Sequence, residues 1–479
     1  MPAAATFYWH DYETWGADPR RDRACQFAGL RTDADLNEIG VPLVCFCRPT
    51  PDLLPHPDAC LITGLTPQRA AREGLNEAAF AQAIYAELIR PGTCGVGYNN
   101  LRFDDEVTRH LFYRNFLDPY AREWRDGNSR WDLIDVLRLA QALRPDGLDW
   151  PLNAEGAPSF RLEHLTAANG IAHGHAHEAL ADVRATIALA RRLRDAQPRL
   201  FNYALALRDK QRVRKLLAER KPLLHASARF PAALGCIAPV LAVAEHPTDA
   251  NGVICFDLRT DPTPLLELSV AELQQRVFTP VADLPPTVER VPLKTVHVNR
   301  APMLAPLNTL TAERAARWQI DPAQVARHAA WIAANAPEIA QRVRAVHQPL
   351  PVLETDPELT LYSGGFISDA DRRACEQVAR ANPEQLASAP PRFADPRLTT
   401  LLFRYRARNW PETLTPMEQD EWDAYRLMRL TDPTGGASLQ LEAYETRLAE
   451  LAALHASDAA KLQILDALTA WGEQVLDAE

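Results

Sequence analysis

Two carboxylates stand two residues apart near the start of the chain, at Asp11 and Glu13. They lie in the run 7–14, whose aromatic residues are typical of a β-strand. Side chains two apart on a strand project from the same face, so these two carboxylates point the same way. Their mutual repulsion is relieved when a divalent cation lies between them, and Mg²⁺ and Mn²⁺ favour such oxygen ligands. The alternative is a strand end with two solvated acids, because so short a motif often matches by chance.

A third acid, Asp104, follows the run 95–100, which we expect to be a buried strand that leads into a turn. Open α/β sheets build their ligand sites where strands end, so this position favours a functional carboxylate. The next two acids, Asp105 and Glu106, have a simpler explanation, because acids in the first turn of a helix complement its free amides and its dipole.

A fourth acid, Asp182, lies inside a helix expected over 179–193, and His177 precedes it by five residues. Four carboxylates from three segments could hold two divalent ions, which activate a water molecule and stabilise a departing oxygen in phosphodiester hydrolysis. A neutral histidine beside them, His177, could accept the proton of that water. The sequence therefore predicts a two-metal site with His177 as its general base.

Zinc is the weaker interpretation of the other metal-binding side chains. His173, His175 and His177 alternate, and Cys45 and Cys47 are separated by one residue. Structural zinc sites draw their ligands at wider spacing, and the cysteines have no partner pair. We assign no role to His173 and His175, for which a surface position is the default.

The totals describe an ordinary folded protein. With 479 residues, 47% apolar and 24% charged, the chain is long enough for about three domains. A formal charge of −10 argues against a basic surface over the whole chain, although it leaves room for a local basic groove. We find no signal peptide and no membrane span, and expect a cytoplasmic protein whose eight cysteines are buried, reduced thiols.

Strands and helices alternate over the first 195 residues. We expect a meander of strands at 7–14, 25–32 and 42–47, and the strand at 95–100 after a helix at 77–89. Further helices are predicted over 106–116, 129–143 and 179–193. From 200 to 220 we predict one basic helix, and short β runs between 223 and 298 favour a small barrel or sandwich. Helices are predicted over 369–382, 417–429, 439–455 and 458–476.

Aromatic and arginine side chains alternate in two regions. Tyr120 and Trp124 accompany Arg109 and Arg138 in the first, and the run 401–410 carries the second. Such residues usually form core and surface. They also suit a channel for single-stranded nucleic acid, where rings stack on bases and guanidinium groups hold phosphates.

The motifs Asp-x-Glu-Thr at 11–14, Asn-x-x-Phe-Asp at 100–104 and His-x-x-x-x-Asp at 177–182 resemble the histidine-containing branch of the DEDD exonuclease superfamily. The strings at 97–100, 102–109, 129–132, 158–165 and 405–409 are similar to the bacterial exonuclease I family. This similarity extends over nearly the whole chain.

The resemblance implies an α/β fold with three domains. These are a ribonuclease-H-like exonuclease domain over 1–196, an SH3-like β domain over 197–350 and a helical C-terminal domain over 351–479. The implied activity is processive 3′→5′ removal of 5′-mononucleotides from single-stranded DNA with two Mg²⁺ ions, or Mn²⁺, in DNA repair and recombination.

The resemblance also implies roles for individual residues. Asp11, Glu13 and Asp182 would be metal ligands, Asp104 would complete the acidic set, and His177 would be the base. The implied strand contacts, besides Glu13, are Arg161 at the terminal phosphate, Phe160 beside it, and Arg109, Tyr120, Trp124 and Arg138.

The family also binds the acidic C-terminal tail of the single-stranded-DNA-binding protein, which makes that tail an expected partner of a monomeric enzyme. Arg144 and Tyr203 stand at matching positions, whereas Thr311 replaces an expected arginine.

Two rival functions stay open. One is an exonuclease for RNA or for proofreading, which the two added domains disfavour. The other is a nucleic-acid-binding scaffold without activity, which predicts the loss of a carboxylate or of the histidine.

Overall fold

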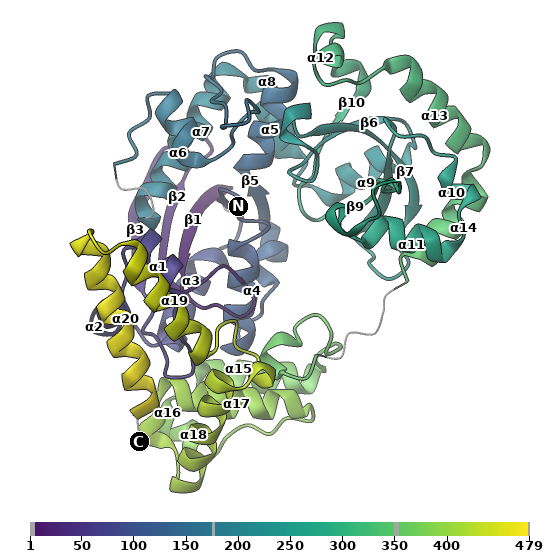
Figure 1. Cartoon of the computed structure of the whole chain (residues 1–479). Helices are drawn as coiled ribbons and strands as arrows, with labels where there is room; N and C mark the ends of the chain where they lie inside the picture. The colour runs from purple at the N-terminus through teal and green to yellow at the C-terminus, as the bar shows by residue number, and fades with distance from the viewer. Residues whose placement is uncertain (1–4, 175–177, 349–353, 478–479) are drawn as a thin grey trace. The chain divides into compact units, whose positions relative to one another are not determined.

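The computed structural model describes residues 5–174, 178–348 and 354–477. The chain divides into two compact units. Figure 1 labels the helices and strands of the chain. Unit 1 comprises residues 1–129, 174–184 and 352–479, and unit 2 comprises residues 130–173 and 185–351. Within the described residues, no helix combines the length and the apolar character needed to cross a membrane.

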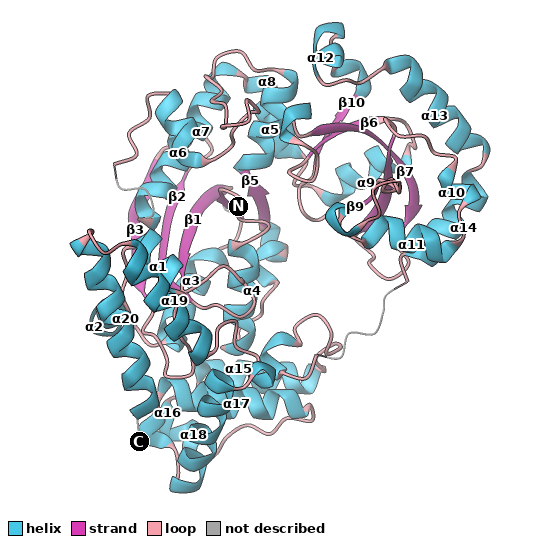
Figure 2. Cartoon of the chain, viewed as in Figure 1, coloured by secondary structure: helices cyan, strands magenta, loops and turns pink. Residues whose placement is uncertain are grey.

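Unit 1 contains a mixed sheet with helices around it (Figure 2). Its strands are β1 (Thr6–Thr14), β2 (Ala24–Thr32), β3 (Glu38–Phe46) and β4 (Thr93–Gly97). Its helices are α1 (Pro57–Thr63), α2 (Pro67–Glu73), α3 (Glu77–Leu88), α4 (Asp104–Arg114), α15 (Asp369–Arg380), α16 (Pro383–Ser388), α17 (Pro396–Asn409), α18 (Pro416–Thr431), α19 (Leu441–Leu454) and α20 (Ala459–Asp477). Strand β5 (Ser129–Asp132) and helix α7 (Ala179–Ala196) cross the division between the units.

The strand order of this sheet is β3-β2-β1-β4-β5. The first three strands form an antiparallel meander, as predicted, and β4 runs parallel to β1 on its other side. Strand β1 therefore lies between two neighbours, and its aromatic residues Tyr8 and Trp9 are almost fully buried. The pairing with β2 shifts register between Glu13 and Thr14, so the regular ladder ends directly after the second carboxylate.

Unit 2 contains an antiparallel sheet in the order β10-β6-β7-β8-β9. These strands are β6 (Leu223–Ala226), β7 (Ile237–Glu245), β8 (Gly252–Asp257), β9 (Leu293–His297) and β10 (Met303–Pro306). Its helices are α5 (Leu133–Leu143), α6 (Leu162–Ala168), α8 (Pro198–Ala206), α9 (Lys210–Ala218), α10 (Pro264–Glu267), α11 (Val270–Phe278), α12 (Ala312–Arg317), α13 (Pro322–Ala334) and α14 (Ala336–Val346). The predicted small β domain is confirmed.

Two predicted helices are wrong in their extent, and an aspartate explains each. The helix expected over 129–143 begins only at Leu133, because β5 comes first and the Asp132 carboxylate accepts a hydrogen bond from the Ile134 amide as the N-cap. The basic helix expected over 200–220 is broken into α8 and α9. Asp209 caps the start of α9 in the same way, which favours two helices over one.

The helices at the end of the chain pack against residues near its beginning. Trp15, Cys25, Leu53 and Cys60 share one apolar core with Tyr444, Leu448, Leu468 and Trp471 of α19 and α20. Figure 1 shows these two helices beside α1. The eight cysteines are free, six of them buried and two half-buried, which confirms the expected reduced thiols.

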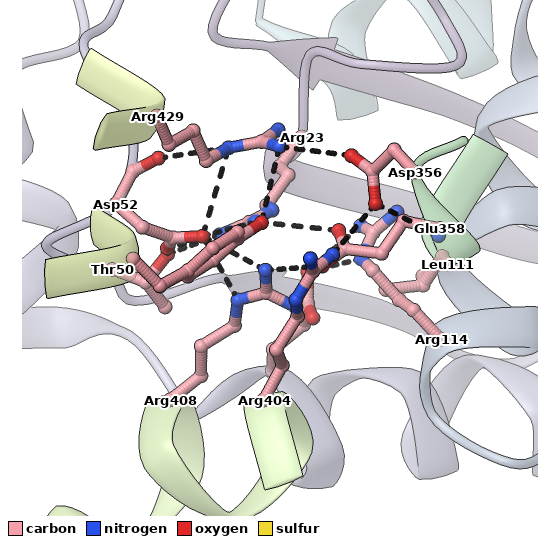
Figure 3. Close-up of polar contacts among 12 residues, drawn as sticks. Arg23, Thr50, Asp52, Leu111, Arg114, Asp356, Glu358, Arg404, Arg408 and Arg429 are labelled. Carbon is pink, nitrogen blue, oxygen red and sulfur yellow. Dashed lines mark hydrogen bonds and ion pairs between the residues drawn. The ribbon is translucent and has the colours of Figure 1, made fainter. Parts of the chain in front are cut away.

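A buried network of ion pairs joins the same parts of unit 1 (Figure 3). Asp52, which is fully buried, accepts bonds from Arg23, the residue before β2, at 2.8 Å and from Arg408 of α17 at 2.8 Å. Glu358 lies 3.1 Å from Arg404 and also pairs with Arg408. The arginines of the run 401–410 are therefore buried in ion pairs, and the structural interpretation of that run is confirmed.

The pKa values in this network show how strongly the charges depend on one another. Burial alone would raise the pKa of Asp52, but the Arg23 and Arg408 guanidinium groups hold it well below its usual range. Arg408, Arg404 and Arg23 do the same for Glu358. Each carboxylate is thus ionised in the folded protein only because the guanidinium groups face it.

Replacement of Asp52 by asparagine should destabilise unit 1 strongly. Removing one partner of a buried pair leaves an uncompensated charge, which costs about 3–5 kcal/mol of unfolding free energy. Since the folded pKa of Asp52 is lowered, its stabilisation is present above the ordinary pKa of an aspartate and is lost as the pH falls below it. Urea unfolding at neutral pH should show a lower midpoint for Asp52→Asn.

The matched control is Glu73→Gln, which removes an exposed carboxylate that pairs with Arg69 and Arg72. Its midpoint should equal that of the wild type, because exposed pairs contribute little. Equal midpoints for Asp52→Asn and Glu73→Gln would show that the buried network does not stabilise the unit.

Candidate active site with clustered carboxylates

Three of the predicted carboxylates meet at one point of unit 1. Asp11, Glu13 and Asp182 each offer an oxygen, and these atoms lie within 4.8 Å of one another. Asp11 and Glu13 come from the same face of β1, opposite Ala28 and Gln26 of β2, as the two-residue spacing predicted. Asp182 is in the first turn of α7. Asp11 and Asp182 are half-buried, and Glu13 is buried.

The fourth carboxylate, Asp104, adjoins this cluster. It is the first residue of α4 and is buried. One of its oxygens accepts a hydrogen bond of 3.2 Å from the backbone amide of Tyr12, the residue between Asp11 and Glu13. Thr108, one turn along α4, donates its hydroxyl hydrogen to the Asp104 carbonyl at 2.7 Å, and its hydroxyl oxygen lies 3.0 Å from that of Tyr12. Two residues of α4, Asp104 and Thr108, therefore hold the start of the helix against Tyr12 of β1.

The neighbouring acids have structural partners, as expected from their positions in the helix. Asp105 pairs with the buried Arg122 at 2.6 Å, and Glu106 pairs with Arg109 at 2.7 Å. Asp104 thus differs from the two acids that follow it, because it faces other carboxylates.

Electrostatics distinguish this cluster from the buried network around Asp52. Burial, followed by the charges of Asp104, Glu13 and Asp182, raises the pKa of Asp11 well above its usual range. Burial, then Asp182 and Asp104, raises the pKa of Glu13 to about 8. Ionisation of the cluster is therefore opposed, because its surroundings do not balance the negative charge, and a divalent cation among these oxygens would balance the ionised carboxylates.

The cluster fits the metal ions predicted from the sequence. All four side chains offer hard oxygen donors, which Mg²⁺ and Mn²⁺ prefer over softer ligands. Asp11, Glu13 and Asp182 are close enough to share an ion, and Asp104 is held beside them. The predicted base, His177, lies outside the described residues, as does His175. His173 is described, and its Nδ1 lies 3.1 Å from the Thr166 hydroxyl.

Besides Glu13, three predicted strand contacts lie in unit 1. Arg109 is buried, and its guanidinium group binds Glu123 at 2.8 and 2.9 Å, Glu106 at 2.7 Å and the Tyr362 hydroxyl at 3.1 Å. The Tyr120 ring lies under this group, 5.4 Å from its central carbon. Trp124 has 64% of its surface exposed. In this arrangement Arg109 holds its neighbours in place, while Trp124 is accessible for stacking.

The other predicted contacts lie in unit 2. Phe160 is buried, and Arg138 lies 5.5 Å above its ring while also pairing with Asp135 at 2.6 Å. Arg161 is exposed and pairs with Glu163. Among the residues expected to bind the protein tail, Arg144 donates to the Thr309 carbonyl at 3.1 Å, and Thr311 caps helix α12.

Several residues near the cluster were not expected from the sequence. Tyr12 contributes its amide to Asp104, and Tyr362 reaches Arg109 from 253 residues further along the chain. The Asp-x-Glu motif includes Tyr12 but gives no sign of its amide's role. No local pattern could have indicated Tyr362, because a contact over so long a separation leaves no periodic signal.

Divalent ions should stabilise the protein through this cluster. A ligand that binds only the folded state, present at a free concentration a hundred times its dissociation constant, adds about 2.7 kcal/mol to the free energy of unfolding. We expect Mn²⁺ or Mg²⁺ to raise the melting temperature of the wild type, measured by scanning calorimetry against the EDTA-treated protein. The shift should be lost in Asp11→Asn, because that change removes a carboxylate from the shared site.

Glu354→Gln is the control, because Glu354 lies outside the cluster and should keep the shift. If divalent metal raised the melting temperature of Asp11→Asn as much as that of the wild type, the ion would bind outside this cluster.

Three family models match the chain in consecutive segments. A model described as "Exonuclease" matches residues 8–190, one described as "Exonuclease I SH3-like domain" matches 208–349, and one described as "Exonuclease I C-terminal domain" matches 355–475. The four clustered carboxylates all fall within the first segment.

Curated relatives and solved structures match over almost the full length. Exodeoxyribonuclease I of Escherichia coli strain K12 is 45% identical over 98% of both chains. The structure of a moderately thermophilic exonuclease I from Methylocaldum szegediense is 50% identical, with a TM-score of 0.94 over 99% of this chain and 100% of the other. E. coli exonuclease I in complex with a dA16 oligonucleotide gives a TM-score of 0.93 at 45% identity, over 98% and 100% of the two chains.

Proposed function

The chain belongs to the exonuclease I family, and on that premise we propose that it degrades single-stranded DNA from the 3′ end to 5′-mononucleotides by two-metal-ion hydrolysis. Family membership confirms an exonuclease with the expected order of exonuclease, SH3-like and C-terminal domains. The observation that carries the proposal is the carboxylate cluster, whose unbalanced charge suits metal-dependent chemistry at a phosphodiester.

We assign the metal ligands to Asp11, Glu13 and Asp182, with Asp104 completing the set. Two divalent ions bound there, Mg²⁺ or Mn²⁺, would supply an activated water molecule and stabilise the leaving oxygen. The residues of the chain hold this geometry. Strand β1 sets the spacing of the first two carboxylates, and the Tyr12 amide fixes the orientation of Asp104.

His177 is the proposed general base, which accepts the proton of the attacking water. It precedes the cluster ligand Asp182 by five residues, so the sequence brings it near the ligands. Arg161 with Phe160, Arg138, Arg109, Tyr120 and Trp124 are the proposed strand contacts. Among them Trp124 has the exposed ring that base stacking requires.

The wider biological role follows from the proposed reaction. Removal of single strands serves DNA repair and recombination, in a monomeric cytoplasmic enzyme. We propose domain boundaries near 196 and 350, supported by the gaps between the family models at 190–208 and 349–355. E. coli exonuclease I has been captured with single-stranded oligonucleotides, which supports the same substrate here.

The tail of the single-stranded-DNA-binding protein is the proposed protein partner. Arg144 and Tyr203 are the proposed contacts for this acidic peptide, and Tyr203 lies 5.6 Å beneath the Arg212 guanidinium group. Thr311 has a neutral side chain and supplies no positive charge, and its hydroxyl accepts a bond from the Arg314 amide. Docking should therefore rest on fewer cations than the family pattern implies.

Asp182→Ala should abolish hydrolysis and keep strand binding, because it removes a metal ligand while leaving the strand contacts. The assay uses single-stranded DNA labelled at the 3′ or the 5′ end, with matched RNA and duplex, in Mg²⁺ and in EDTA. The wild type should release the 3′ label as a mononucleotide only from single-stranded DNA with metal. Full activity of Asp182→Ala would contradict the site, and preferred loss of RNA would contradict the substrate.

His177→Ala should lower the turnover number by about 10² to 10⁴, the usual contribution of a general base. His177→Ala should still bind the ions, so divalent metal should raise its melting temperature as it does in the wild type. Asp11→Asn, which should lose that rise, gives the contrast. A turnover number equal to that of the wild type would remove His177 from the mechanism.

A further inference from the structure

Helix α9 contains the most basic segment of the chain, and the proposed function gives it no role. Five of the eight residues from 208 to 215 are arginine or lysine, and the one acid among them, Asp209, is the N-cap of the helix. The formal charge of the whole chain is −10. Positive charge is therefore concentrated in this segment against the overall balance of the protein.

The helix packs one apolar side against the sheet of unit 2 and exposes its cations. Val213 and Leu217 are buried, and the helix contacts strand β7. Arg212 and Lys215, which are three residues apart, are neighbours on the helix surface. The exposed cations of the helix, called the α9 cations below, are Lys210, Arg212, Arg214 and Lys215.

In the parts of the chain that the structure describes, no carboxylate forms an ion pair with an α9 cation. Arg214 donates to a backbone carbonyl at 2.7 Å, and the Arg212 guanidinium group lies 5.6 Å from the centre of the Tyr203 ring. Neither contact neutralises the positive charge. Arg138 and Arg259 of the same unit each pair with an aspartate at 2.6 Å, so the α9 cations differ from them.

The positions of these cations oppose the stability of the helix. Lys210 and Arg212 lie in its first turn, where the positive end of the helix dipole repels cations. Lys210 and Arg214 are four residues apart, a spacing at which like charges repel each other. An anionic ligand would relieve this repulsion. The helix therefore has the character of a binding surface for negative charge.

The length of the surface and a neighbouring ring favour single-stranded nucleic acid as its ligand. The nine residues of α9 extend over about 13 Å, and a phosphodiester backbone presents one negative charge for each nucleotide along such a length. The Tyr203 ring is half-buried beneath Arg212. An aromatic ring beside a guanidinium group suits the bases and phosphates of a single strand. An acidic peptide would use the charges but has no bases to stack.

We propose that the α9 cations bind the phosphate backbone of single-stranded DNA without sequence preference. Helix α9 belongs to unit 2, whereas the four clustered carboxylates belong to unit 1. The contact therefore contributes to the capture of the strand and takes no part in the hydrolysis. The inference rests on the proposed single-stranded DNA substrate and adds a contact surface outside the active site.

The test neutralises two neighbouring α9 cations in the full chain, as Arg212→Gln together with Lys215→Gln. Fluorescence anisotropy measures the Kd of a labelled oligonucleotide at several concentrations of potassium chloride, with EDTA present so that the strand is not cut. Each phosphate contact contributes about 0.7 to the slope of log affinity against log salt for a single strand. The slope should therefore fall by about 1.4, equally for oligo-dT and oligo-dA.

Two controls separate the α9 surface from net charge. Arg327→Gln together with Arg344→Gln removes two exposed arginines of α13 and α14, and this variant should keep the wild-type slope. The exchange Arg212→Lys together with Lys215→Arg preserves the charge on α9 and should also keep it. Equal losses of slope in the two neutralised variants would overturn the inference, because net charge alone would then explain the effect.

An unchanged slope in the neutralised α9 variant would also overturn the inference. The same result, accompanied by weaker binding of an acidic peptide of ten aspartates and glutamates, would assign the surface to a protein partner instead. Lys210→Gln together with Arg214→Gln repeats the comparison if the first variant fails to fold. A wild type that neither binds nor hydrolyses single-stranded DNA in Mg²⁺ would refute the proposed function, so the two failures are distinguishable.

Discussion

Repulsion among clustered carboxylates is the constraint around which unit 1 is built. Asp11, Glu13 and Asp182 repel one another once they are ionised, and burial together with this mutual charge raises the pKa values of Asp11 and Glu13. A strand inside a sheet and the first turn of a helix hold them within 4.8 Å. The rigidity of β1, between β2 and β4, thus maintains a charge distribution that the side chains alone oppose.

The C-terminal helices contribute to that rigidity through carboxylates that, unlike those of the site, face arginines. Asp52 and Glu358 are buried carboxylates too, yet arginines surround them and lower their pKa values. One of these arginines, Arg23, directly precedes β2, and the others come from α17 and α18, so the network joins segments at the two ends of the chain. The apolar core shared by Trp15 and Trp471 does the same without charge.

The sequence predicted the local parts of this architecture well. The Asp-x-Glu spacing placed two ligands on one face, and turn and strand patterns gave the meander. Errors came where a capping aspartate competed with helical periodicity, at Asp132 and Asp209. The run 401–410 was ambiguous, because alternating arginines and aromatics look alike in a buried network and in a nucleic-acid channel. Only the positions of their acidic partners, far away in sequence, decided between the two.

The same reasoning explains why a cavity that lies beside Glu13 in unit 1 could not be predicted. Its walls combine the loop after β1 with residues more than 300 positions later, and contacts such as Ser438 with Asp22 leave no pattern in the sequence. What separates structural from functional charge in this unit is the location of the counter-ion. In the network around Asp52 the arginines lie between the carboxylates and balance them. In the cavity that Glu13 and Ser438 line, Arg21 faces the same space as its partner Asp18, whereas Arg404 pairs with the lining residue Asp356 without lining the cavity in the described part of the chain.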